Sequence, residues 1–119
     1  MSTMMFLLML TSCVVFVAMG VPFVMSAVPP NRIYGFRIRR TLQDPEVWYA
    51  ANRVAGLWSV GTGIVAAAVS IATFALGVRF VTAAILDLVP FILGIAGMLV
   101  HVFRVIRHVV DHRQKSANG

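Results

Sequence analysis

The residues from about Met4 to Val28 contain no charged side chain, and this run limits what the chain can fold into. An α-helix rises about 1.5 Å per residue, so the run is long enough to cross the bilayer's hydrocarbon core of about 30 Å. A cleaved signal peptide is the alternative interpretation. No basic residue precedes the run, however, and Met25-Ser26-Ala27 is a poor cleavage site. We therefore expect a first transmembrane helix over residues 4–28.

Two more apolar runs follow, at about residues 56–76 and 81–103, with a short turn that contains Arg79 between them. The second run is preceded by Asp44-Pro45-Glu46, a pattern typical of a helix start: an N-cap aspartate, a proline in the first turn and an acidic neighbour. Residues 45–55 include Trp48 and Tyr49, which favour the membrane interface. The helix from Pro45 is therefore expected to lie at the interface first and to cross the membrane from Gly56.

Composition agrees with this interpretation, because 60% of the residues are hydrophobic and the mean hydropathy is +0.90, far above the values of soluble proteins. We predict an all-α integral membrane protein with three transmembrane helices and an interfacial helix before the second span. Residues 1–119 would form a single membrane domain, with a loop over residues 29–55 and a polar tail over residues 104–119.

The basic residues predict the orientation. Nine of the ten basic residues fall on the side shared by the loop and the tail, and only Arg79 falls on the other side. The nine are Arg32, Arg37, Arg39, Arg40, Arg53, Arg104, Arg107, Arg113 and Lys115. The positive-inside rule then places the N-terminus outside, and the loop and C-terminus in the cytoplasm. Basic loops beside membrane helices also explain the net charge of +6, so no nucleic-acid partner is expected.

No catalytic, cofactor or metal site is expected. The chain has a single cysteine, Cys13, within the first span, whereas its histidines lie near or beyond the end of the third. These histidines are His101, His108 and His112. His108 and His112 share one helical face, but a zinc site needs further ligands that the sequence does not supply. No phosphate-binding or dinucleotide motif occurs, and we expect the protein not to be an enzyme.

Asp87 is the one acidic residue within a predicted span, and an intramembrane carboxylate is a candidate functional group. It lies six residues after Val81, roughly 9 Å from the start of the helix, so water or Arg79 could also satisfy it near the outer interface. A structural role and a role in transport both remain open at this point.

Small residues in the second and third spans permit close approach between helices. They are Gly61, Gly63, Ala67, Ser70, Gly94 and Gly97. They can serve packing within the chain, or association with a protein partner or a second copy of the chain.

The loop and the helix start carry a more specific pattern. Its elements, in order, are Pro30-Asn31, Gly35-Phe36-Arg37, Arg40-Thr41-Leu42, Trp48, Asn52 and Gly56. In residue types and spacing this pattern resembles the signature of the SdpI family of bacterial integral membrane proteins. The resemblance covers about a quarter of the chain, and the flanking spans are compatible with it.

The resemblance implies a location in the bacterial cytoplasmic membrane and a role of the immunity type. The founding member protects a cell from its own membrane-active peptide toxin and signals by holding a repressor at the membrane. We therefore expect a toxin-immunity or signalling protein whose basic loop is a cytoplasmic docking surface. The alternative is an accessory subunit of a larger bacterial membrane complex for transport, respiration or envelope biosynthesis. A small transporter component that uses Asp87 is a third possibility.

The motif residues also have physical roles of their own. Gly35 supplies a turn, and the arginines from Arg37 to Arg40 can meet anionic lipid headgroups or an acidic partner. Trp48 and Asn52 are four residues apart and share one face of a helix. Our hypothesis is that Thr41 and Asn52 tie the loop to this helix and that Trp48 is a buried anchor.

Overall fold

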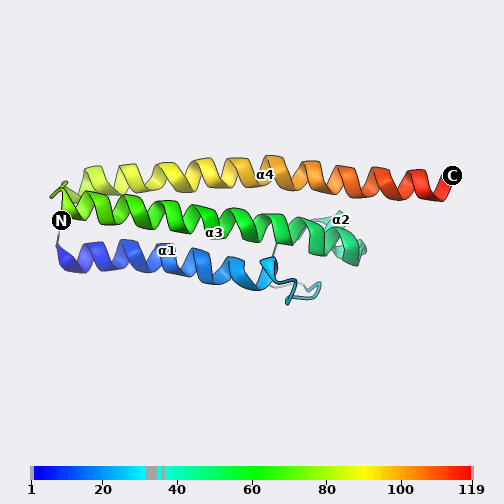
Figure 1. The fold of residues 1–119 in the computed structure, drawn as a ribbon, viewed down its shortest axis with the longest axis horizontal. Helices are drawn as coiled ribbons and strands as arrows, with labels where there is room; N and C mark the ends of the chain where they lie inside the picture. Colours follow the sequence, from blue (N-terminus) through cyan, green and yellow to red (C-terminus); the bar gives the residue numbers. More distant parts are fainter. Residues whose placement is uncertain (1, 32–34, 36, 119) are drawn as a thin grey trace.

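Three long helices lie side by side in the computed structural model, which describes residues 2–31, 35 and 37–118, with the backbone alone at residues 39 and 40 (Figure 1). They are α1 (Thr3–Val24), α3 (Pro45–Ala75) and α4 (Phe80–Asn118), and the short α2 (Arg39–Gln43) precedes α3. The long helices are each long and apolar enough to cross a membrane. Every regular element in the described part of the chain is a helix. This confirms the prediction of an all-α membrane protein with three spans.

The bundle has two distinct ends, and α3 runs through its middle between α1 and α4 (Figure 1). The N-terminus lies beside the turn between α3 and α4, and we call this the N-terminal end. The segment between α1 and α3, together with α2, lies at the opposite end, which we call the loop end. α4 continues past the loop end to the C-terminus, so the molecule is elongated, with extents of 61 × 21 × 19 Å.

Helix α1 ends at Val24, four residues before the predicted end of the first span and ahead of the two prolines. The amide of Ala27 donates to the carbonyl of Pro22, and the amide of Ser26 donates to that of Phe23. Ser26 has a φ of 55°, in the left-handed region. This is the arrangement of a Schellman-type helix end, which closes the helix through its own carbonyls.

Helix α3 begins as its sequence predicts. Oδ1 of Asp44 accepts a hydrogen bond of 3.0 Å from the amide of Glu46, and Pro45 occupies the first turn. α3 then continues without a break to Ala75. The predicted interfacial segment and the second span are therefore one continuous helix.

The backbones of α1 and α3 touch at two glycines. A Cβ built on Gly20 would lie 2.6 Å from the carbonyl oxygen of Gly56, and one built on Gly56 would lie 2.7 Å from that of Gly20. Seven residues further along α3, Gly63 approaches the Cys13 carbonyl in the same way, at 2.8 Å. Small residues at a seven-residue spacing are typical of a left-handed helix pair, in which they permit the closest approach.

A hydrogen bond adds to the contact between α1 and α3. The Ser59 hydroxyl donates to the carbonyl of Phe16 over 2.7 Å. Such bonds across helices are typical of membrane bundles, because a hydroxyl facing hydrocarbon would have no water to bind.

The contact between α3 and α4 also depends on glycines. A Cβ at Gly94 would collide with the Thr62 side chain, and one at Gly97 would lie 2.5 Å from the Trp58 ring. Nε1 of Trp58 in turn donates to Nδ1 of His101 over 3.0 Å. Gly63, Gly94 and Gly97 thus serve packing within the chain, as the sequence allowed.

The predicted polar tail is helical in the structure, because α4 continues to Asn118. On the inner face of α4, Val102 at the end of the predicted span and Ile106 in the tail are buried against Val47 and Ala51 of α3. An apolar seam therefore extends along both helices at the loop end.

Beyond this seam, an ion pair joins α4 to the start of α3. The guanidinium of Arg113 lies 2.5 Å from Oδ2 of Asp44 and 2.6 Å from Oε2 of Glu46. About half of the Arg113 side chain is exposed, so its energetic contribution is small. Its value is positional, because it sets the outer part of α4 against the first turn of α3.

The glycine contact between α1 and α3 generates a stability prediction. We expect Gly20→Ala to lower the free energy of unfolding by about 1–3 kcal/mol, the usual cost of inserting a methyl group into a packed interface. The measurement is unfolding by SDS in mixed micelles, followed by circular dichroism. Gly61→Ala is the control, because its Cβ would meet nothing within 4 Å. Equal effects of the two substitutions would contradict the interpretation.

Candidate functional site

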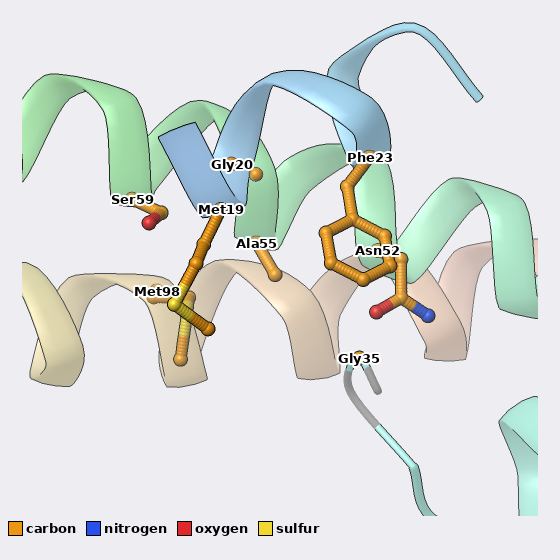
Figure 2. A pocket seen from close by; sticks show the side chains of 9 residues that line it. Met19, Gly20, Phe23, Gly35, Asn52, Ala55, Ser59 and Met98 are labelled. Carbon is orange, nitrogen blue, oxygen red and sulfur yellow. The ribbon is translucent and has the colours of Figure 1, made fainter. Parts of the chain in front are cut away.

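A cavity of about 240 Å³ lies at the loop end, where α1, α3 and α4 meet the loop. Three residues of the sequence motif, Gly35, Asn52 and Gly56, take part in its lining (Figure 2). The other lining residues are Met19, Gly20, Phe23, Ala55, Ser59 and Met98. Residues that are distant in sequence but belong to one motif therefore meet at one place, which makes this cavity the candidate functional site.

Asn52 is the main polar group of the cavity. Only 2% of the residue is exposed, and its Nδ2 donates a 3.0 Å hydrogen bond to the Trp48 carbonyl one turn earlier. Figure 2 shows the amide projecting from α3 toward Gly35, with the Phe23 ring beside it. This bond holds the amide in one orientation at the edge of a mainly apolar cavity.

Gly35 fits against that amide because it has no side chain. Its φ is 116°, which L-residues with a side chain rarely adopt. A Cβ there would lie 2.9 Å from Oδ1 of Asn52 and 3.0 Å from Cε1 of Phe23. The position therefore requires glycine for two reasons, backbone conformation and close contact.

Trp48 connects the same helix to the segment that leaves α1. Its side chain is fully buried, and Nε1 donates a 3.0 Å hydrogen bond to the carbonyl of Val28. A buried indole needs such a partner for its N–H group, and the bond fixes the start of the loop on α3. The geometry agrees with the hypothesis that Trp48 is a buried anchor.

The remaining motif residues of the loop lie outside the cavity lining. The buried Thr41 hydroxyl accepts from the Ile38 amide and donates to the Ile38 carbonyl, both over 2.9 Å, which closes the start of α2. Nδ2 of Asn31 donates to the Pro29 carbonyl over 2.9 Å. Arg37 is exposed, whereas the Arg40 side chain lies outside the described part of the chain.

The cavity suits binding rather than bond chemistry. Its polar side chains are the Asn52 amide and the Ser59 hydroxyl, and neither is a nucleophile with an adjacent base. Among the described residues, no group of three or more His, Cys, Asp or Glu side chains could hold a metal ion. A small apolar group with one hydrogen-bonding atom is the kind of occupant that fits such a surface.

Several lining residues were not identified from the sequence as site residues. Phe23 and Met19 lie within the uncharged run of α1, where one apolar side chain looks like any other. Gly20 has a detectable signal: it follows Cys13 by seven residues, and Gly56, Gly63 and Ser70 repeat that spacing in α3. A heptad of small residues in two spans could have predicted which helix faces meet.

Asp87 lies apart from this cavity. It is on α4 near the N-terminal end, only seven residues after Phe80, and it is 6% exposed. Arg79 makes no ion pair with it, since the ion pairs within the described residues are those of Arg113. The sequence-predicted site residues therefore fall into two separate groups, the loop-end motif and this acid.

A sequence model of the SdpI/YfhL protein family matches residues 27–104, which is more than half of the chain. The matched range includes the loop, α2, α3 and most of α4 up to its outer part. No curated protein and no solved structure matches the chain.

The Trp48 bond to the loop can be tested with a conservative substitution. Trp48→Phe keeps an aromatic ring but leaves the Val28 carbonyl without its indole partner, which costs about 1–3 kcal/mol for a buried group. We expect trypsin to cut residues 29–43 roughly tenfold faster, since about 1.4 kcal/mol corresponds to a factor of ten. Trp58→Phe is the control, because its indole bonds to His101 of α4 instead. Unchanged cleavage in Trp48→Phe would show that the bond does not hold the loop.

Proposed function

Because the chain belongs to the SdpI/YfhL protein family, we propose that it is a non-enzymatic membrane protein of the toxin-immunity or signalling type. In this proposal the basic loop is the docking surface for a partner. The family match covers the loop and the two helices that support it. The immunity role is the one that the resemblance of the loop motif implies.

The observation that carries the proposal is the way the loop is held. Trp48 binds its start, and Gly35 sits directly against Asn52, so two points of the loop rest on α3. Arg37, two residues after Gly35, is exposed. An exposed arginine close to a point where the loop contacts α3 is a suitable contact for an acidic surface.

We further propose that the loop end faces the cytoplasm of a bacterial cell and that the N-terminus lies outside. The excess of basic residues at the loop end supports this orientation. The arrangement of the bundle agrees with it, because the N-terminus and the α3–α4 turn share the opposite end (Figure 1).

Anionic lipid headgroups are a second proposed contact of the loop end. Arg37, Arg53 and Arg104 are exposed there. Each basic residue close to an anionic membrane surface contributes about 1 kcal/mol of attraction. This attraction would hold the loop end at the headgroup level while a protein partner binds.

The proposal predicts a phenotype in the strain that carries the gene. Spent medium from the wild-type culture should inhibit a deletion strain, because that medium contains any toxin the strain makes. The wild-type protein should restore growth. Arg37→Glu should restore it poorly, because the loop loses a positive charge and gains a negative one.

Arg79→Glu is the matched control, an exposed arginine reversed at the N-terminal end, and it should restore growth fully. Growth of the deletion strain in wild-type spent medium would contradict immunity. Full restoration by Arg37→Glu would contradict the docking role of the loop but not immunity itself.

A groove favours a second function, that of an accessory subunit in a larger bacterial membrane complex. It has a volume of about 420 Å³ and lies between α3 and α4, with Gly61, Val65 and Leu93 among its lining residues. Gly61 is exposed, and a Cβ there would meet nothing within 4 Å. An exposed glycine in an apolar groove is the type of surface on which another membrane helix packs closely.

The subunit function predicts a stoichiometric partner after gentle detergent extraction at native expression. Gly61→Leu should fill the groove and release that partner while leaving the fold intact, because the side chain points into open space. The measurement is mass spectrometry of the proteins that co-elute with the chain. Gly77→Leu cannot serve as the control, because Gly77 has a φ of 70° and a side chain there would strain the backbone. Leu57→Ala is the better comparison for a mild change in the same groove. Elution of the wild-type protein alone or as a homo-oligomer would contradict the subunit function.

A further inference from the structure

Three polar side chains from three helices meet near the N-terminal end of the bundle. Cys13 of α1 and Ser70 of α3 are fully buried, with Sγ and Oγ 4.0 Å apart. The Ser70 hydroxyl also lies near the carboxyl group of Asp87 on α4, a residue that is itself buried. The acid is therefore built into the bundle and does not project into water.

One carboxyl oxygen of this acid has no partner. Oδ1 of Asp87 is buried and makes no hydrogen bond, although 94% of the residue is removed from the surface. A buried polar atom without a partner is rare and costs free energy, so its occurrence requires an explanation. In the low-dielectric surroundings of a bilayer, a carboxyl group needs either a proton or a cation to compensate its charge.

Asp87 is also among the residues that line a cavity of about 270 Å³. Its walls come from α1 and α4 alone, so it opens sideways between these helices and not toward α3. The lining residues are Met9, Ser12, Ala84, Asp87, Leu88 and Phe91. The Ser12 hydroxyl donates to the Leu8 carbonyl and can still accept a hydrogen bond, but the Asp87 carboxyl is the one lining group that can carry a negative charge.

We propose that this cavity binds an amphiphile with an ammonium group on an apolar chain, which enters from the bilayer. The ammonium group would donate to the carboxyl group of Asp87, and the chain would lie against the apolar walls. Asp87 lies seven residues into α4, roughly 10 Å from the helix start, a depth that a lipid-embedded amine can reach. No lysine or arginine of the described chain pairs with this carboxylate, so an incoming cation meets no competitor.

This site is independent of the proposed function, which rests on the loop at the opposite end of the bundle. Loss of ammonium binding would leave the loop contacts intact, and loss of loop docking would leave this cavity intact. The two proposals can therefore fail separately.

The test uses the full chain in lipid nanodiscs and the apolar reagent dicyclohexylcarbodiimide, which attacks carboxyl groups from within the membrane. The carboxyl oxygen of Asp87 adds to the central carbon of the reagent while the carboxyl proton moves to one of the reagent's nitrogens, and the product rearranges to an N-acylurea that peptide mass spectrometry locates. We expect dodecylammonium to slow labelling of Asp87 about tenfold, the ratio that one hydrogen bond to a charged group produces. Dodecanol has the same chain without the charge and should protect far less.

Two variants accompany the measurement. Asp87→Asn should abolish the adduct, whereas Asp111→Asn, which changes an exposed carboxyl group on the same helix, should leave it unchanged. Ala84→Leu fills the cavity and should slow labelling even without the amine, with helicity checked by circular dichroism. Absence of labelling at Asp87, or equal protection by dodecanol and dodecylammonium, would overturn the proposal. Because protection is measured in the wild-type protein, a variant that fails to fold does not affect the outcome.

Discussion

The direct contact between the backbones of Gly20 and Gly56 is the constraint on which the rest of the structure depends. In a bilayer the lipid tails are as apolar as the side chains, so helices associate through close packing and hydrogen bonds. Glycines let α1 approach α3 until carbonyl oxygens oppose the Cα atoms of the other helix. Gly20 and Gly56 also line the cavity at the loop end, together with Phe23 and Asn52, so the cavity lies beside this close contact.

The loop follows from the same contact. Because α1 is seated on α3, its exit at Val28 lies within reach of the Trp48 indole, and the chain returns so that Gly35 covers Asn52. The motif residues thus hold the loop on α3 and thereby also set the position of the exposed Arg37. A substitution at Trp48 would alter the docking surface without touching any residue that a partner contacts.

The fold was predictable from the sequence because an uncharged apolar run that is long enough to cross the bilayer indicates a transmembrane helix. The start of α3 was equally predictable, since Asp44 and Pro45 have local roles that need no tertiary contact. The assembly of the site was only partly predictable. The motif indicated Gly35 and Asn52. Phe23 and Met98 line the cavity because of the faces that α1 and α4 turn toward it, and a run of apolar residues does not show which face that is. The pairing of Arg113 with Asp44 joins residues 69 apart and depends on the helical path of the tail.

The length of α4 has a mechanical consequence. It is a single helix of 39 residues that contains Pro90, and it places Asp87 and Arg113 roughly 39 Å apart along its axis. A tilt of about 5° around the Asp87 level would displace the distant guanidinium by about 3 Å, by the geometry of a straight helix. A displacement of that size would lengthen the contacts of 2.5 and 2.6 Å between Arg113 and Asp44 and Glu46 beyond the reach of an ion pair. A small tilt of α4 within the membrane would therefore break or restore the ion pair of Arg113 at the loop end.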